Sequence, residues 1–166
     1  MARYLGERGF SLHSLSDVIR DAAAERGLPP TREHLIRIGN LLREEGGPGV
    51  LAERIVARLG DRDVVDSIRN PGEVAALRRV EGFTLVAVSA PTDLRFGRSL
   101  QRARPGDPAS LEEFELREAQ ENSADPRAQQ LEATSRLADH RLVNDGDLTV
   151  LCRGVDRLLE TIERGD

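Results

Sequence analysis

A short stretch near the middle of the chain predicts a strand, a sharp turn and a helix in immediate succession. Its sequence, residues 64–73, is Val-Val-Asp-Ser-Ile-Arg-Asn-Pro-Gly-Glu. The β-branched run ends at Asp66. Asn70 is a typical N-cap, because proline follows at the first helical position and Glu73 stands where a capping box needs it. Open α/β sheets bind ligands at the carboxyl ends of their strands, so we expect Asp66 and Arg69 to lie at a ligand-binding edge.

Predicted strands alternate with predicted helices along the whole chain. Apolar or alternating runs predict strands at 10–15, 64–66, 83–88 and 140–144. Amphipathic spacing and stop signals predict helices at 2–9, 17–26, 50–59, 71–79, 92–103 and 147–163, and further helices after Thr31, Ser110 and Asp125-Pro126. This alternation predicts a three-layer α/β fold, with a mainly parallel sheet between helical layers, in a single domain that spans residues 1–166.

Composition limits the classes of function. The net charge of −5 argues against a nucleic-acid partner held by a basic field. No apolar run approaches the length of a membrane span, and the start of the chain is too polar for a signal peptide. We therefore expect a cytoplasmic protein with no membrane partner. Cys152 is the only cysteine and the three histidines are far apart, so neither a disulfide nor a metal-ligand spacing is present.

Several short segments carry a resemblance to a known family. They are Ala2–Phe10, Ser16–Arg20, Asp66–Arg69, Arg95–Arg104 and Asn144–Gly146. The first resembles the end of the helix that follows the phosphate loop in P-loop nucleotide kinases, and the second resembles their acceptor-site motif. The others resemble, in order, the motif closing the third strand, the lid entrance and the loop against the nucleotide base. The likeness is to the branch with dephospho-coenzyme A kinase and small nucleotide-kinase-like relatives, and it implies a helical acceptor-binding insert at 21–60 and a lid region at 92–124.

The resemblance also implies roles for individual residues. Asp66 would hold Mg²⁺ through water or orient the acceptor, and Asp17 would accept the proton of the incoming hydroxyl or phosphate. Arg98 and Arg102 would close over the transferring phosphoryl group and exclude water. The remaining implied residues are Arg20, Arg69, Arg95 and Arg104 for substrate phosphate and Asn144 for the base of ATP.

Each of these assignments has a purely structural alternative. In that alternative Asp66 and Arg69 form an ion pair that fixes the turn, and Asp17 only caps a helix. The arginines of 92–104 then form a solvated basic face beside the glutamates of 112–118, and Asn144 caps the turn into the last helix. The residues by themselves leave both interpretations open.

The chain departs from the family pattern at its start. All 24 Lys-plus-Arg residues are arginine, and no Gly-x-x-x-x-Gly-Lys-Ser/Thr loop occurs. The resemblance puts the first strand, which precedes that loop, in the middle of the sheet. Its absence is expected to leave two strands with unpaired edges, which favours self-association or pairing with another chain. A segment of about twenty residues upstream of Met1 would complete the fold.

Two functions follow as expectations. The first is a nucleotide kinase-like phosphotransferase that moves the γ-phosphoryl group of ATP, with Mg²⁺, to a small nucleotide or coenzyme precursor. Without a phosphate loop the chain as it stands is expected to be inactive. The second is a non-catalytic remnant of a kinase fold that binds a nucleotide or a partner and is completed by another chain. Cytidylate, other monophosphates and dephospho-coenzyme A all remain open as acceptors.

Overall fold

The computed structural model describes residues 1–103 and 106–164, so Arg104 lies outside the described residues. The helices are α1 (Ala2–Glu7), α2 (Leu15–Glu25), α3 (Arg32–Gly46), α4 (Val50–Val56), α5 (Pro71–Leu77), α6 (Thr92–Arg102), α7 (Leu111–Gln120), α8 (Leu131–Arg136) and α9 (Leu148–Arg164). The strands are β1 (Ser11–Ser14), β2 (Asp63–Asp66), β3 (Val86–Ser89) and β4 (His140–Val143).

Helices and strands alternate as predicted, and the α/β class is confirmed. The helix expected directly after Asp125-Pro126 is wrong. The Asp125 carboxylate accepts hydrogen bonds from the backbone N–H and the guanidinium of Arg127, which turns the chain there. Asn122 and Gln130 then form an antiparallel bridge, and the helix begins only at Leu131. Among the described residues, no helix is long and apolar enough to cross a membrane.

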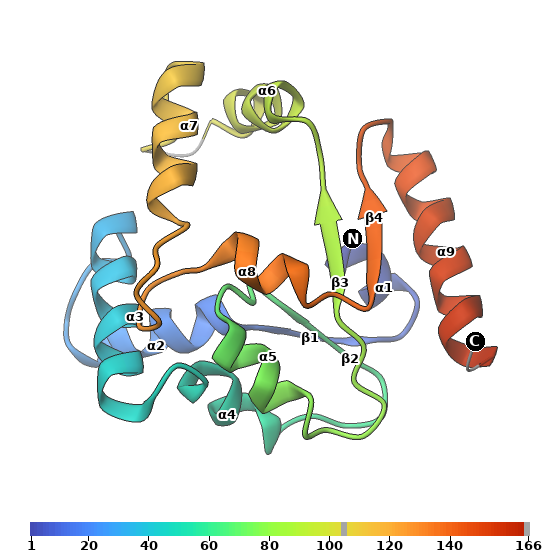
Figure 1. Cartoon of the computed structure of the whole chain (residues 1–166), viewed down its shortest axis with the longest axis horizontal. Helices are drawn as coiled ribbons and strands as arrows, with labels where there is room; N and C mark the ends of the chain where they lie inside the picture. The colour runs from blue at the N-terminus through green and yellow to red at the C-terminus, as the bar shows by residue number, and fades with distance from the viewer. Residues whose placement is uncertain (104–105, 165–166) are drawn as a thin grey trace.

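The strands form two separate parallel pairs (Figure 1). β1 pairs with β2, with Ser11 opposite Asp63 and Ser14 opposite Asp66. β3 pairs with β4 from Val86 opposite His140 to Ser89 opposite Val143. Within the described ranges, β2 pairs only with β1 and β3 only with β4. The predicted parallel pairing is confirmed, but the described strands form two small sheets instead of one. In these ranges β2 and β3 each keep an edge without a strand partner, as the absence of a first strand led us to expect.

The main hydrophobic core lies among helices α2 to α5. It is built from fully buried side chains that include Leu15, Ile38, Leu42, Leu51 and Leu77. The expected insert at 21–60 is helical, since it consists of most of α2 together with α3 and α4. Val65 of β2 and Ile68 of the following turn pack against this core, which helps to hold the end of β2.

Helices α6 and α7 form an arm that lies in the upper part of Figure 1, whereas α4 and α5 lie in the lower part. The rings of Phe96 and Phe114 join the two helices, with their centroids 5.8 Å apart. Arg95 and Glu118 form an ion pair between them. The arm corresponds to the predicted lid region, 92–124.

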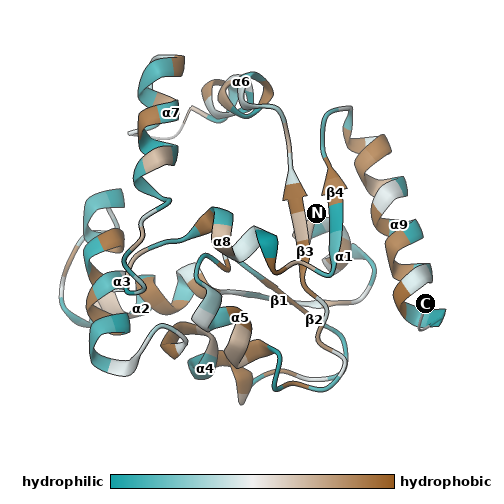
Figure 2. Ribbon diagram, viewed as in Figure 1, coloured by the Kyte–Doolittle hydropathy of each residue, from teal (hydrophilic) through white to brown (hydrophobic). Residues whose placement is uncertain are grey.

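The β3–β4 pair is held at its start by Asp139. Its carboxylate accepts a hydrogen bond from the backbone N–H of Leu85 at 2.8 Å and another from the guanidinium of Arg78 at 2.9 Å. These bonds lower the pKa of Asp139, the backbone hydrogen bond contributing most. Figure 2 shows mostly hydrophobic residues along β3, and α9 stands beside β4.

Candidate functional site

A hydroxyl and carboxylate cluster lies where β1 and β2 end. We call it the strand-end cluster, and it consists of Ser14, Asp66 and Ser67. Ser14 stands opposite Asp66 in the strand register. The Ser14 hydroxyl donates to the Ser67 hydroxyl at 3.2 Å, and Ser67 donates to the Asp66 carboxylate at 3.0 Å. Asp66 is exposed, so its second carboxylate oxygen is accessible to a ligand or an ion.

Ser67 has a strained backbone. Its φ of 62° lies in the left-handed region, where residues other than glycine are uncommon. Such a conformation persists only where the surroundings enforce it, and it is concentrated at binding and catalytic sites. Here the two hydroxyl hydrogen bonds and the capped helix that follows hold the turn, so the strain singles out the end of β2 as a site candidate.

A buried ion pair fixes the turn from behind. The Glu73 carboxylate, fully buried, accepts hydrogen bonds from Arg43 of α3 through Nε at 3.2 Å and Nη2 at 2.8 Å. Its other oxygen accepts from the backbone N–H groups of Arg69 at 2.7 Å and Asn70 at 3.1 Å. The Asn70 side chain completes the predicted capping box by accepting from Gly72 at 2.8 Å. The turn is therefore tied to the helical core through Glu73 and Arg43, and not through an Asp66–Arg69 ion pair.

Arg69 lies next to this turn with its guanidinium in contact with the segment that leads to α8. Nη1 donates to the side-chain oxygen of Gln129 at 3.2 Å, and the Arg69 carbonyl accepts from the backbone of Gln130 at 2.7 Å. No ion pair joins Arg69 to Asp66 among the described contacts. A single neutral hydrogen bond leaves most of the guanidinium donors of this half-buried side chain available to an anion.

Asp17 and Arg20 lie on the first turns of α2, directly after β1. They contact each other, and their side chains are 62% and 49% exposed. The alternative that Asp17 caps the helix is wrong, because Ser14 occupies the N-cap position. Both side chains are therefore accessible to solvent on α2, three and six residues beyond Ser14.

A cavity of about 370 Å³ opens beside the cluster. Asp66, Ser67 and residues 64–65 line one side, residues 85–88 of the β3 region line another, and α8 contributes Leu131, Thr134 and Ser135. We call this cavity, which extends from the end of β2 to β3, cavity 2. Its volume is within the range of small-molecule pockets. It provides room for a ligand whose charged end contacts Asp66.

The arginines of α6 do not share one site. Arg95 donates to the Ala90 carbonyl and the Thr92 hydroxyl, both at 2.9 Å, in addition to its ion pair with α7. Arg102 lies 3.4 Å from both carboxylate oxygens of Asp107. Their spacing on one helical face was predicted, but each guanidinium has a partner within the arm.

Arg98 is the residue of α6 that reaches the β3–β4 pair. It donates to the carbonyl of Asn144 at 2.8 Å and to that of Gly146 at 3.0 Å. The backbone N–H of Asn144 in turn donates to the Ser89 carbonyl at 2.7 Å. The Arg98 side chain therefore contacts the backbone of Asn144. These two residues were predicted for the same nucleotide site.

The described residues form neither a complete metal site nor a triphosphate cradle. They contain no group of three or more His, Cys, Asp or Glu side chains that would enclose a metal ion. Asp66 with the hydroxyls of Ser14 and Ser67 offers oxygen ligands of the type that Mg²⁺ takes through water. A triphosphate needs a glycine-rich cradle and a lysine, which the sequence lacks.

Comparison with known proteins gives the family. The chain is 36% identical over 158 residues to a UPF0200 protein of Hyperthermus butylicus, and the match covers 93% of the chain and 82% of that relative. It is 33% identical over 168 residues to a UPF0200 protein of Thermococcus gammatolerans, covering 96% and 86%. The chain belongs to the UPF0200 family. A UPF0200 protein of Halobacterium salinarum is 36% identical over 159 residues, covering 91% and 80%.

No protein-family model matches this UPF0200 chain. The family designation names no substrate, cofactor or reaction, so the site has to carry the functional argument. Sequence reasoning missed the roles of Ser14 and Ser67 in the cluster and of Arg43 behind it. Ser14 ends a predicted strand, which is the signal that could have found it. The Arg43 contact joins α3 to α5 across 30 residues of sequence, and no local pattern marks it.

Proposed function

We propose that the chain is a nucleotide kinase-like phosphotransferase, built to move the γ-phosphoryl group of ATP to a small nucleotide or coenzyme precursor. The observation that carries the proposal is the strand-end cluster opening onto cavity 2. A carboxylate and two hydroxyls meet there at the carboxyl ends of parallel strands, where α/β proteins bind their ligands, and Arg69 follows three residues after Asp66.

The proposed roles follow from the chemistry of each group. Asp66 would hold Mg²⁺ through water, and a bound ion would supply neutralisation of the charge on the reacting phosphates. Arg69 and Arg20 bind the phosphate of the acceptor, since guanidinium groups match its oxygens in a planar fork. Asp17 accepts the proton that the attacking group loses.

The arm has a positioning role in this proposal. Arg98 holds the 144–146 loop through two carbonyl hydrogen bonds, and that loop would lie against the nucleotide base with Asn144 in contact. Arg95 and Arg102 have to exchange their partners within the arm for phosphate when the lid closes. Both side chains are partly exposed, so breaking their present ion pairs costs little free energy.

Phosphoryl transfer also needs a phosphate loop, so the 166-residue chain by itself should show no ATP turnover. The experiment measures ADP formation with Mg²⁺, nucleoside monophosphates and dephospho-coenzyme A. It compares the 166-residue chain with a form extended ahead of Met1 by an added strand and phosphate loop of about twenty residues. We call it the longer form. It should transfer phosphate to at least one acceptor.

Variants of the longer form test the site. Asp66→Asn should lower kcat by about 10²–10³-fold, the usual cost of removing one electrostatic stabiliser of the transition state. Glu160→Gln, an exposed change on α9, is the matched control and should leave kcat unchanged. Turnover by the 166-residue chain alone refutes the need for a loop, and a folded longer form inactive with every acceptor refutes the kinase proposal.

A non-catalytic module is the second candidate. The observation that favours it is that, in the described ranges, β2 and β3 each have an edge without a strand partner, where another polypeptide can pair. Size-exclusion mass distinguishes the two proposals cheaply. A lone, folded monomer argues against completion by a partner chain, and a stable complex with transfer absent favours it.

A further inference from the structure

Arg69 has a neutral partner, although the arginines that hold its turn and the neighbouring segment are paired with carboxylates. These ion pairs are Arg43 with Glu73 and Arg127 with Asp125. Arg69 instead donates from Nη1 to the side-chain oxygen of Gln129 at 3.2 Å. The chain has 29 Asp and Glu residues against 24 arginines, so a shortage of carboxylates does not explain the amide partner.

The segment that carries Gln129 runs between α7 and α8 (Figure 1) and is fixed to the turn by hydrogen bonds. The Asn70 side chain donates from Nδ2 to two carbonyl oxygens within 126–128, at 2.7 Å and 2.9 Å. The backbone N–H of Gln130 donates to the Arg69 carbonyl at 2.7 Å. The side chains of Arg69 and Gln129 are both half-buried. The backbone contacts therefore place Gln129 beside Arg69, and the contact does not depend on a freely rotating surface side chain.

The charge of this partner decides what Arg69 can bind. A carboxylate typically takes two guanidinium donors in a bidentate pair and cancels the positive charge. The carboxamide oxygen of Gln129 takes one donor and carries no charge, so the guanidinium keeps its other donors and its full charge. Charges interact more strongly in a half-buried position than in bulk water. Gln129 therefore orients Arg69 without neutralising it, which is the state that binds an oxyanion.

Glu73 contacts the Arg69 backbone, but its charge is already compensated. Its Oε2 accepts from the Arg69 backbone N–H at 2.7 Å, and its Oε1 accepts from the Arg43 guanidinium at 2.8 Å. Both members of the Arg43–Glu73 pair are buried. The pair leaves no net charge behind the turn, so Glu73 does not compete with an anion for Arg69.

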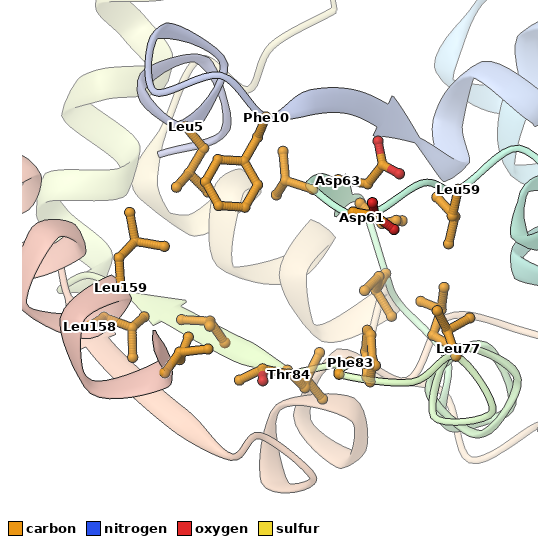
Figure 3. A pocket seen from close by; sticks show the side chains of 18 of the residues that line it. Leu5, Phe10, Leu59, Asp61, Asp63, Leu77, Phe83, Thr84, Leu158 and Leu159 are labelled. Atoms are coloured by element: carbon orange, nitrogen blue, oxygen red, sulfur yellow. The ribbon is translucent and has the colours of Figure 1, made fainter. Parts of the chain in front are cut away.

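Another cavity of the molecule offers an anion no comparable partner. Its volume is about 220 Å³, and Figure 3 shows mostly apolar side chains around it, among them Leu5 and Phe10. The charged side chains that the structure describes in its lining are Asp61, Asp63 and Glu81. These carboxylates repel an anion. Arg69 with Gln129 is the better anion site.

We propose that Gln129 is a positioning residue, which holds the Arg69 guanidinium for an oxyanion and leaves its charge unpaired. The inference rests on the proposed function for the identity of that oxyanion, which is the phosphate of the acceptor. Its physical basis is the neutral amide partner and needs no phosphoryl transfer. An anion that binds at Arg69 without being a nucleotide would therefore count against the proposed function alone.

The test is an NMR titration of the 166-residue protein with sulfate, and separately with nucleoside monophosphates and dephospho-coenzyme A, that follows the Nε–H signal of Arg69. In the parent, sulfate should shift this signal. Gln129→Glu has the same shape but adds a carboxylate, and it should weaken sulfate binding at least about tenfold. Its melting temperature should not fall, because the new carboxylate pairs with Arg69. A loss of affinity without a loss of stability separates positioning from a merely structural role. Gln120→Glu, an exposed change on α7 with the same effect on net charge, is the control and should bind sulfate like the parent.

The outcomes separate this inference from the proposed function. Equal sulfate affinity in the parent and Gln129→Glu, or an Arg69 signal that responds to no probe, overturns the role of Gln129. A parent that binds sulfate at Arg69 but no nucleoside monophosphate or dephospho-coenzyme A refutes the proposed acceptor and leaves that role intact. If Gln129→Glu does not fold, Gln129→Met decides, because it keeps the length and removes the hydrogen-bond acceptor. It should bind sulfate several-fold more weakly, and unchanged affinity overturns the inference.

Discussion

Replacing Glu73 with alanine tests how the turn at the end of β2 is held. Its side chain is fully buried, and its two oxygens accept four hydrogen bonds, two from Arg43 and two from the backbone of Arg69 and Asn70. Glu73→Ala leaves the Arg43 charge buried without its partner, and breaking a buried pair in this way costs about 3–5 kcal/mol. Domains are stable by only about 5–15 kcal/mol. For a chain of this size, the melting temperature should fall by about 6–20 °C.

Urea unfolding of Glu73→Ala and of its controls measures this effect. Glu53→Ala is the matched control, because Glu53 and its partner Arg79 are 47% and 70% exposed. Such a surface pair contributes about 0–1 kcal/mol. The double variant Arg43→Met with Glu73→Leu should recover part of the loss, since it leaves no unpaired buried charge. A loss below about 1 kcal/mol in Glu73→Ala refutes the conclusion that this ion pair organises the turn.

Three further predictions concern other parts of the fold. The pKa of Asp139 is lowered by the hydrogen bond from the Leu85 backbone N–H and, to a lesser extent, by Arg78. The ionised Asp139 carboxylate therefore contributes its full stabilisation above the unfolded pKa of about 4, and this stabilisation is lost as the pH falls through the lower folded pKa. Urea titrations should accordingly show Asp139→Asn less stable than the parent at pH 6 but approaching it near pH 3, and a constant difference contradicts this. Ala103→Gly should stabilise the chain by about 0.5–1 kcal/mol, because Ala103 ends α6 in the left-handed region at φ 47°, and a lower melting temperature rejects the strain argument. Arg98→Met removes both hydrogen bonds to the loop after β4 and should speed amide exchange there, with exchange in α4 as the unaffected reference.

Local signals predicted the strand, turn and helix around Asn70 well. The N-cap, the proline at the first helical position and Glu73 act within one turn of helix, so they can be recognised without knowledge of the fold. The structure confirms the capping box, the Thr31 and Ser110 caps and the order of strands and helices. Element boundaries differ by a few residues, as is usual where helix ends fray.

The contacts across the fold were not predictable from local pattern. The burial of Arg43 depends on its packing against α5, 30 residues away in sequence. The positive φ of Ser67 depends on hydrogen bonds from β1. The separation of the sheet into two pairs was expected only from the family resemblance, because no local pattern in β2 or β3 encodes it. The arginines of α6 follow the predicted spacing, but long side chains choose among partners that only tertiary structure brings near.

The central claim is that the carboxyl ends of β1 and β2 bind the phosphate of an acceptor nucleotide. The most direct measurement is an amide chemical-shift titration of the 166-residue protein with nucleoside monophosphates and dephospho-coenzyme A. At least one compound should shift the amides of residues 14–20 and 66–69 together, and Arg69→Gln should weaken that binding by about tenfold or more. Shifts confined to other regions, or equal affinity in Arg69→Gln, would contradict the claim.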